Sequence, residues 1–463
     1  MNTNESLMGV TELAFSLDAE FSSCNSKDYF KSVSIDSRTV EEGALFFALQ
    51  GNICDGHAFV DAAFKKGACA AVVERSKIKS FNLTNISKGK NLIIVADSLK
   101  ALHDSAGLYL DKFPKLLKIG ITGSCGKTTT KEIAVSIISA EKNTVMNKGN
   151  FNSETGLPLS IFGVRDFHEA GIFEIGISAK GDMLSLSKIL RPNIALITNI
   201  GTAHIASFGS RKEILNEKKR IFDFLKDEDT ALIPDKDEFK KELAEGVIGK
   251  VKFYGKEAFE ELGAVRSLGL EGTQIEWAGE KIHFALPGKH SLDDAVAAIS
   301  IARLVPVSND AIKRGLESVK PLFGRLEILK GRTTVLRDCY NANPESTAKS
   351  IEFCDSLEWE GRRIYVIADM LELGEFSEDA HLNIGKVLAH SKADKIFLFG
   401  TEIKATVDSI NNTKPVFYTD NINILSNELD RYVQSKDIVL LKGSRLLSLE
   451  RLSNMLTEAK DVS

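Results

Sequence analysis

The sequence predicts an α/β protein made of three domains, two of which contain doubly wound, mostly parallel sheets. Three observations lead to this prediction. The chain has 463 residues, which corresponds to about three domains of ~150 residues each. Strand-like apolar segments alternate with helical patterns from about residue 116 to residue 320, as in parallel sheets covered by helices. The same alternation begins again near residue 321.

The predicted domains cover residues 1–113, 114–320 and 321–463. The first is a small α/β domain with short strands at SVSID, ALFFAL, ACAAVVE and NLIIVA, and it ends at a break in DKFPK. The central domain is expected to hold a mostly parallel sheet, with strands at LLKIGITG, AGIFEIGI, IALITNI, TALIPD and KVKFYG. The third is Rossmann-like, with strands at TTVLRD, RIYVIAD, KIFLFG, PVFYTD and DIVLLKG.

Composition excludes several classes of protein. The formal net charge of −5 argues against a surface for nucleic acid or anionic membranes. No apolar run approaches the ~18 residues of a membrane helix, and the first residues lack a basic segment of the signal-peptide type. We therefore expect a cytoplasmic protein without stable membrane insertion. The six cysteines form no C-x-x-C pair, which disfavours zinc and a disulfide framework: they are residues 24, 54, 69, 125, 339 and 354.

A phosphate-binding loop is predicted in GITGSCGKTTTKEI (120–133), where a strand, a glycine turn and a helix follow one another. The loop departs from G-x-x-x-x-G-K-[ST], because Ile121 stands at the first glycine position and Gly123 shortens the loop. Backbone N–H groups at such a junction converge at the positive end of the helix dipole, which attracts phosphate. An ordinary glycine turn is the alternative, which G-K-T-T disfavours. The expected ATP-binding residues are Gly123, Ser124, Cys125, Gly126, Lys127, Thr128 and Thr129.

Two residues at strand ends of the same predicted sheet have side chains of the metal-binding type. Glu174 lies in the otherwise apolar GIFEIG, and His204 follows the strand in ALITNIGTAH. Buried glutamate is costly unless it is paired or binds a cation. Either residue alone could be structural, with Glu174 pairing a base and His204 capping a turn. Beside a phosphate loop whose Thr128 hydroxyl can hold Mg²⁺, the two together indicate a Mg²⁺ site.

These motifs resemble those of the Mur ligases, ATP-dependent amide-forming enzymes of peptidoglycan synthesis, which share the T-G-x-x-G-K-T-T loop with the folylpolyglutamate synthases. Within that family the chain is similar to the branch that adds D-alanyl-D-alanine to UDP-MurNAc-tripeptide. The resemblance extends from about residue 33 to residue 450. It is carried by residues 36–74, NKGNFNSETGLPLSIF (147–162), EIGISAKGDM with TNIGTAHIASFGS, and DCYNANPES (338–346).

The resemblance implies an ADP-forming ligase that uses ATP and Mg²⁺ in a cytoplasmic step of cell-wall biogenesis, and through it affects cell shape, the cell cycle and cell division. The γ-phosphate would move to the tripeptide carboxylate, and the amine of D-alanyl-D-alanine would attack the resulting acyl phosphate. These two substrates are the expected partners, and a monomer is the expected state. The resemblance does not indicate the third residue of the tripeptide.

The resemblance also implies roles for residues outside the loop. Lys127 would neutralise phosphate charge, and Glu174 and His204 would hold a second Mg²⁺. Ser37 and Arg38 resemble contacts to the uridine diphosphate, although Arg38 could be an ordinary surface arginine. The remaining expected contacts are Asn150 and Asn152 for the substrate, and His290, Asp294, Arg325, Asp338 and Asn341 for ATP. Asp338 has a structural alternative, as a cap at the end of a strand.

Lys218, in NEKKRIFDF (216–224), aligns by the same resemblance with a lysine that CO₂ carbamylates and that would then act as a metal ligand. A helix here would place Lys218 and Phe222 one turn apart, with Ile221 and Phe222 in the core. A carbamate has two anionic oxygens and suits Mg²⁺, whereas an ammonium would be repelled. From the residues alone, Lys218 reads as one of several solvated lysines on a charged helix face.

One segment departs from the family pattern. The family has H-N-x-x-N-A where this chain reads HSLDDA (290–295), so that Ser291 and Asp294 replace two asparagines. An ionised Asp294 only accepts hydrogen bonds, whereas an amide also donates. Recognition of the adenine is therefore expected to differ from that of the family.

Two other functions remain open at this point. The chain could be a different ligase of the superfamily, adding the third amino acid or acting as a folylpolyglutamate synthase, although DCYNANP and the amino-terminal domain disfavour both. It could also be a non-catalytic nucleotide switch, but NKGN at 147 lacks the aspartate of a guanine-binding N-K-x-D motif.

Overall fold

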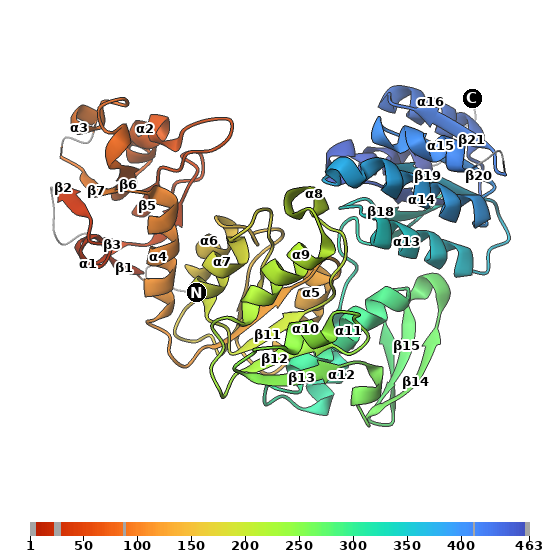
Figure 1. Cartoon of the computed structure of the whole chain (residues 1–463), viewed down its shortest axis with the longest axis horizontal. Coiled ribbons are helices and arrows are strands. Elements are labelled where there is room, and N and C mark those ends of the chain that lie inside the picture. The colour runs from red at the N-terminus through yellow and green to blue at the C-terminus, as the bar shows by residue number, and fades with distance from the viewer. Residues whose placement is uncertain (1–5, 23–28, 87–88, 411–412, 459–463) are drawn as a thin grey trace.

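The computed structural model describes residues 6–22, 29–86, 89–410 and 413–458. Figure 1 shows three bodies arranged along the longest axis, with amino-terminal, central and carboxy-terminal segments following one another from left to right. Each is built on α/β secondary structure, as the sequence predicts. The large sheets lie within the three predicted domain ranges, and the domain limits themselves stay a prediction. None of the described helices is long and apolar enough to cross a membrane.

The amino-terminal body contains a five-stranded sheet in the order β2-β7-β6-β5-β4. Its strands β4 to β7 are parallel and include the four predicted segments, while β2 adds an antiparallel edge. The strand bounds are β2 (Glu20–Ser22), β4 (Ser32–Ser34), β5 (Ala44–Phe47), β6 (Ala70–Glu74) and β7 (Asn91–Val95), with β1 (Met8–Gly9) paired separately to β3 (Tyr29–Phe30). The helices are α1 (Val10–Ser16), α2 (Val60–Lys65), α3 (Leu83–Ile86) and α4 (Ser98–Leu110), and α4 contacts helices of the central body.

The central body has a six-stranded sheet, entirely parallel, in the order β13-β12-β11-β8-β10-β9. The bounds are β8 (Leu117–Thr122), β9 (Thr144–Met146), β10 (Ala170–Glu174), β11 (Ile194–Ile197), β12 (Thr230–Pro234) and β13 (Lys250–Tyr254). The chain leaves β8 toward β9 and β10 on one side and adds β11 to β13 on the other. The carboxyl end of β8 is therefore a topological switch point, the place where open α/β sheets bind ligands.

Helices cover both faces of this sheet. They are α5 (Lys127–Ile138), α6 (Gly156–Ile161), α7 (Asp182–Leu190), α8 (Ile205–Phe208), α9 (Arg211–Lys219), α10 (Lys240–Ala244), α11 (Lys289–Ala302) and α12 (Asn309–Ser318), and the 3₁₀ turn η3 (Arg220–Phe222) follows α9. The predicted continuous helix over residues 216–224 is wrong in this detail, because α9 ends at Lys219. The predicted burial of Ile221 and Phe222 is confirmed, with both side chains at most 3% exposed.

A small antiparallel sheet interrupts the strand–helix alternation that the sequence predicts up to residue 320. It consists of β14 (Leu262–Ser267), β15 (Thr273–Trp277) and β16 (Glu280–Phe284). Its signal is readable in TQIEWAGEKIHF, where alternating apolar residues flank a two-residue turn. Ala278 and Gly279 in this turn both have positive φ angles, of 50° and 81°, which a tight hairpin requires. The expectation of simple alternation was therefore wrong here.

The carboxy-terminal body has a six-stranded sheet in the order β17-β18-β22-β19-β20-β21, parallel except for β17. The bounds are β17 (Glu327–Lys330), β18 (Thr334–Asp338), β19 (Arg363–Ala368), β20 (Lys395–Phe399), β21 (Val416–Thr419) and β22 (Ile438–Lys442). The helices are α13 (Pro344–Ser356), α14 (Ser377–His390), α15 (Ala405–Ile410), α16 (Ile422–Tyr432) and α17 (Ser453–Thr457), with 3₁₀ turns η6 (Gly374–Phe376) and η8 (Arg445–Leu447). The five strands predicted for this domain are confirmed, and η6 contacts α8 of the central body.

Candidate active site

A cavity of about 830 Å³ lies between the central and carboxy-terminal bodies. Its walls come from the carboxyl ends of β8, β10 and β11, from α11, and from the segments that follow β18, β19 and β22. Fifteen of the predicted site residues line it: Ser124, Cys125, Gly126, Lys127, Thr128, Thr129, Asn150, Asn152, Glu174, His204, His290, Asp294, Arg325, Asp338 and Asn341. Residues that are distant in the sequence thus share one chamber.

The phosphate loop connects β8 to α5, and two of its glycines lie very close to side chains of neighbouring segments. Gly123 and Gly126 have φ angles of 148° and 81°, which side chains rarely adopt. A Cβ at position 123 would lie 1.8 Å from Thr198 Oγ1, and one at position 126 would lie 2.1 Å from Asp294 Oδ1. The shortened loop therefore needs both glycines, and Gly126 packs directly against α11.

Two lysines converge on the loop. Lys127 Nζ donates to the Gly123 carbonyl over 2.9 Å, and Lys218 Nζ donates to the same oxygen over 3.0 Å. Lys218 is only 1% exposed, so the solvated-lysine alternative is wrong. Burial and then the charge of Lys127 lower the pKa of Lys218 well below its usual value. The neighbouring Lys219 points elsewhere, donating to the Glu242 carbonyl over 2.6 Å.

Glu174 ends β10 beside the loop and is 1% exposed. Its carboxylate accepts hydrogen bonds from the Thr128 hydroxyl and from Asn152 Nδ2, both over 2.6 Å. Among the described residues no basic side chain lies within ion-pair distance of it, although burying an unpaired carboxylate is costly. A hydroxyl and a carboxylate oxygen at the phosphate loop are the donors that Mg²⁺ takes, and the residues present therefore fit this ion.

A buried chain of hydrogen bonds supports Glu174 from behind. Lys131, fully buried in α5, donates to the Asn147 carbonyl over 2.7 Å. The Asn147 side chain donates to the Glu174 carbonyl and accepts from the Glu174 N–H, each over 2.9 Å. These bonds tie the nucleotide helix to the end of β10 and to the segment that carries Asn150 and Asn152.

His204 lies at the start of α8 with a φ angle of 63°. Its Nδ1 is 2.8 Å from Oε2 of Glu372, which belongs to the carboxy-terminal body. His204 and Glu174 line the same cavity, but each contacts other partners. Within the described ranges, no three His, Cys, Asp or Glu side chains gather as a metal site. A Mg²⁺ ion that takes most of its ligands from nucleotide phosphates needs only one or two protein groups.

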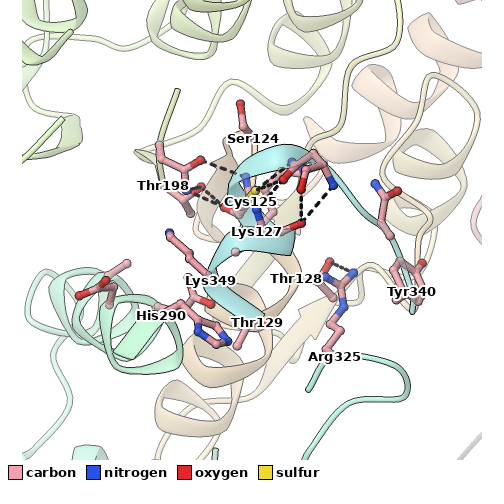
Figure 2. Close-up of a pocket in the computed structure, with 18 of the residues that line it drawn as sticks. Ser124, Cys125, Lys127, Thr128, Thr129, Thr198, His290, Arg325, Tyr340 and Lys349 are labelled. Carbon is pink, nitrogen blue, oxygen red and sulfur yellow. Dashed lines mark hydrogen bonds between the residues drawn. The ribbon is translucent and has the colours of Figure 1, made fainter. Parts of the chain in front are cut away.

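Arg325 reaches from the carboxy-terminal body into the phosphate loop. Its Nη2 donates to Thr128 Oγ1 over 2.9 Å, and its guanidinium lies 4.2 Å from the centre of the Tyr340 ring. Figure 2 shows Arg325 directed at Thr128, with Tyr340 beside it. The hydroxyl predicted to hold Mg²⁺ therefore already joins two bodies.

Asp338 ends β18 and Asn341 follows that strand, and both residues contact Lys442. Lys442 Nζ lies 2.9 Å from Asp338 Oδ2 and donates to the Asn341 carbonyl over 2.9 Å. Although burial opposes it, the charge of Lys442 and a hydrogen bond from Ser350 lower the pKa of Asp338. Asp338 Oδ1 also accepts a hydrogen bond from the Leu326 N–H. Asp338 therefore has a structural role at the end of its strand, and it also lines the cavity.

His290 and Asp294 lie on α11, which forms one wall of the cavity next to the phosphate loop. Burial lowers the pKa of His290 to about 4, so the imidazole is neutral at pH 7. The carboxylate of Asp294 is enclosed although the residue as a whole is half-buried, and this burial raises its pKa well above the usual value. The charge of Lys349 opposes that shift only in part. Asp294 is thus not the plain anion that the sequence suggested.

Ser37 and Arg38 lie in the amino-terminal body, outside this cavity. Arg38 is exposed, and its Nη2 pairs with Asp36 Oδ2 over 2.7 Å. Gly123 and Lys218 are the other predicted residues that do not line the cavity; Gly123 belongs to the loop, and Lys218 lies behind it, bonded to the Gly123 carbonyl.

Sequence reasoning missed most contacts between the two bodies. Glu345 accepts from the Thr202 N–H over 3.0 Å and from the Thr202 hydroxyl over 2.8 Å. Asn343, the N-cap of α13, donates to Cys125 Sγ over 3.1 Å. The N-P-E-S sequence predicts that α13 begins here, but not what its first turn touches.

A phosphate loop and a separate Rossmann-like body that share one cavity define a class of P-loop ligases, in which ATP bound to one domain serves chemistry completed by another. Three sequence models match this chain: "Mur ligase family, catalytic domain" at residues 29–109, "Mur ligase middle domain" at 121–302, and "Mur ligase, glutamate ligase domain" at 324–445. The chain belongs to the Mur ligase family.

Individual relatives cover nearly the whole chain. The UDP-N-acetylmuramoyl-tripeptide--D-alanyl-D-alanine ligase of Treponema pallidum is 38% identical, over 93% of this chain and 95% of its own length. The Bacillus subtilis enzyme of the same name is 33% identical, over 92% and 93%. Among solved structures, MurF from Acinetobacter baumannii superposes with a TM-score of 0.86 at 28% identity, covering 97% of this chain and 99% of its own. MurF ligase from Thermotoga maritima in complex with ADP gives 0.78 at 29% identity, covering 92% and 97%.

Proposed function

We propose that this protein joins D-alanyl-D-alanine to UDP-MurNAc-tripeptide and converts ATP to ADP and phosphate. The observation that carries this proposal is the hydrogen bond from Arg325 to Thr128, because it brings the third domain to the phosphate loop, as a ligase requires. Relatives that carry this activity in their names match more than nine-tenths of the chain.

The proposed reaction has two steps. A carboxylate oxygen of the tripeptide attacks the γ-phosphorus of ATP, the bond to ADP breaks, and an acyl phosphate forms. The amine of D-alanyl-D-alanine then attacks the acyl carbon, loses a proton, and phosphate leaves with the electrons of the C–O bond. Such phosphoryl transfer depends mainly on positioning and on charge neutralisation. Lys127 and Arg325 would supply positive charge at the phosphates.

Mg²⁺ would be held by Thr128 and Glu174, with His204 nearby, and would neutralise phosphate charge when bound. The protein's own contribution is to orient these donors. Asn152 holds the Glu174 carboxylate, and Asn147 holds its backbone on both sides. Glu174 therefore has little freedom to turn away from the loop.

We propose that Lys218 reacts with CO₂ to form a carbamate, which would place an anion behind the loop as a metal ligand. The reaction needs an unprotonated amine, and complete burial beside Lys127 favours that form. Within the described residues, Lys218 has no carboxylate partner at ion-pair distance; its hydrogen bond goes to the carbonyl of Gly123.

The proposal assigns the three domain ranges different tasks. Residues 1–113 would bind the uridine diphosphate sugar through Ser37 and Arg38, with Asn150 and Asn152 directing the peptide toward ATP. Residues 114–320 would bind ATP, with His290 and Asp294 near the base. Residues 321–463 would add Arg325, Asp338 and Asn341. The enzyme would act as a monomer in the cytoplasm, where nucleotide-linked sugar and ATP are both present.

The test measures phosphate release with purified tripeptide substrate, ATP and D-alanyl-D-alanine. The expected result is release that requires all three compounds and yields the pentapeptide product. Release with glutamate or a diamino acid as the amine would instead indicate another ligase of the superfamily. Hydrolysis that neither co-substrate stimulates would indicate a nucleotide switch and overturn the proposal.

A further inference from the structure

We propose that Glu372 and Arg445 bind the two charged ends of the incoming amine substrate, with Glu372 holding its ammonium group and Arg445 its carboxylate. This inference rests on the proposed function, in which that substrate is D-alanyl-D-alanine. Neither residue belongs to a motif that the sequence singles out, and both line the cavity.

The fold brings the two residues to one edge of the carboxy-terminal sheet. β19 and β22 are neighbouring parallel strands, so their carboxyl ends meet. The segments that follow them are joined by two hydrogen bonds, from the Leu371 N–H to Ser444 Oγ over 2.9 Å and from the Ser444 N–H to the Asp369 carbonyl over 3.0 Å. Glu372 comes directly after Leu371, and Arg445 directly after Ser444. These two hydrogen bonds therefore hold the Glu372 carboxylate and the Arg445 guanidinium at the same end of the sheet.

Glu372 is held in a conformation that needs explanation. Its φ angle is 65°, in the left-handed region that glutamate rarely adopts. Its backbone carbonyl accepts from the Ala206 N–H over 3.3 Å, and its side chain meets His204, whose φ angle of 63° is equally unusual. Two strained residues from different domains thus face each other. Strain of this kind persists where the surroundings enforce it, and it clusters at functional sites.

The Glu372 carboxylate retains binding capacity. Its side chain is 60% exposed, and the contact with His204 Nδ1 uses only Oε2. The other carboxylate oxygen of Glu372, Oε1, takes no part in that contact. Because Glu372 lines the cavity, Oε1 can accept a hydrogen bond from a ligand there. An anion beside a phosphate loop opposes ATP binding, whereas an ammonium group brought there as the nucleophile needs such a partner. A carboxylate at this position therefore suits the amine substrate.

Arg445 presents a guanidinium at the start of η8. It pairs with Glu450 through one nitrogen, Nη1, over 2.8 Å, and it lies 5.1 Å from the centre of the Phe323 ring. Its side chain is 50% exposed. This fixed guanidinium keeps donors available for a carboxylate, which arginine binds in a two-pronged geometry.

The chemistry of the substrate favours such a two-charge site. D-Alanyl-D-alanine offers two methyl groups, one amide and two charged ends. It has little apolar surface to bury, so most of its affinity must come from those ends. The phosphates of ATP have their own cations in Lys127 and Arg325, which leaves Glu372 and Arg445 for the dipeptide.

The experiment combines two variants of the full-length protein with two analogues of the dipeptide, one lacking the terminal carboxylate charge and one lacking the amine. Arg445→Gln is assayed with D-alanyl-D-alanine and with its carboxamide, which lacks the terminal charge. We expect its KM for the dipeptide to rise roughly 10- to 100-fold, as for loss of one charge-assisted hydrogen bond. With the carboxamide, wild type and variant should have the same KM.

Glu372→Gln is assayed for its KM for the dipeptide and for inhibition by propanoyl-D-alanine, which lacks the amine. We expect a similar rise in KM, and equal inhibition of wild type and variant. The KM values for ATP and tripeptide should stay unchanged in both variants. Glu375→Gln and Arg451→Gln are matched controls, since both residues are exposed and lie outside the cavity lining; they should behave as wild type.

The outcomes separate the two proposals. Wild-type protein without ligase activity overturns the proposed function, and this inference with it. Active wild type together with an unchanged dipeptide KM in the variants overturns only the inference. If Glu372→Gln alters kcat or the KM for ATP but not the dipeptide KM, then Glu372 merely orients His204, and its assignment to the amine is wrong.

Discussion

Lys218→Met is the change that probes the proposed carbamate most directly. Methionine is an unbranched side chain one heavy atom shorter than lysine, so no large cavity forms. The lost hydrogen bond to the Gly123 carbonyl costs about 1 kcal/mol. Removing an amine that folding must desolvate offsets this cost, because the lowered pKa of Lys218 means that burial opposes its charged form. We expect the free energy of unfolding to change by no more than about 1 kcal/mol.

The expected effect on activity is much larger. Losing one preorganised charged group at a phosphoryl-transfer site typically costs ~10²- to 10³-fold in rate, or about 3–4 kcal/mol. The assay is phosphate release at saturating ATP, tripeptide and dipeptide. Lys219→Met is the matched control, because its Nζ reaches the Glu242 carbonyl instead of the loop; it should keep near-normal turnover.

Two further measurements separate a carbamate from a plain lysine. Labelled bicarbonate should give a carbamate carbon signal in wild type that is absent from Lys218→Met, and short carboxylic acids should restore part of the activity of Lys218→Ala. Full activity of Lys218→Met, or an unchanged wild-type rate in buffer freed of CO₂, would refute the reasoning.

Four other predictions follow from the site. Lys127→Ala should lose most ATP-dependent turnover without a change in melting temperature, since among the described residues the one hydrogen bond of its Nζ goes to the loop carbonyl of Gly123; near-normal turnover would contradict this. Asp294→Asn should tighten ATP binding by roughly 0.5–1.5 kcal/mol in calorimetric titration, because an amide always carries the N–H donor that a carboxyl group has only when protonated; weaker binding would count against it. ATP with Mg²⁺ should slow alkylation of the partly exposed Cys125 but not of the exposed Cys54; equal protection would place the nucleotide elsewhere. His290 has a pKa lowered from 6.5 to about 4, so between these values the unfolded chain binds a proton that the folded one does not, and the free energy of unfolding decreases as the pH is lowered from 6.5 to about 4. His290→Gln should therefore be more stable than wild type by at most roughly 3 kcal/mol at pH 4, and an unshifted acid transition would contradict this.

The parallel sheets and the phosphate loop were predictable because their signals are local. Apolar strand segments and the G-K-T-T junction are each contained in a few consecutive residues. The antiparallel sheet at 262–284 also had a local signal, but its turn at Ala278 and Gly279 was overlooked in a region where helices were expected.

Contacts between residues that are far apart in the sequence could not be predicted from local patterns. Lys218 and Lys219 are neighbours in EKK, and only packing decides that one is buried behind the loop while the other lies half-buried. In the same way, the capping sequence at Asn343 predicts the start of α13, but its contact with Cys125 depends on how two bodies meet. Burial likewise raises the pKa of Asp294, so this carboxyl group resists the ionisation that an exposed aspartate would undergo.

The contact between Gly126 and Asp294 also has a mechanical meaning. The loop approaches α11 here through the Asp294 side chain, so closely that a Cβ at position 126 would lie 2.1 Å from Asp294 Oδ1. A shift of α11 would therefore press on the loop. α11 packs against α5 and belongs to the same apolar core as Trp277 and Phe284 of the antiparallel sheet. The antiparallel sheet, α11 and α5 therefore form one packed unit, and a displacement at the surface of the sheet would be transmitted to the loop that we propose binds the nucleotide phosphates.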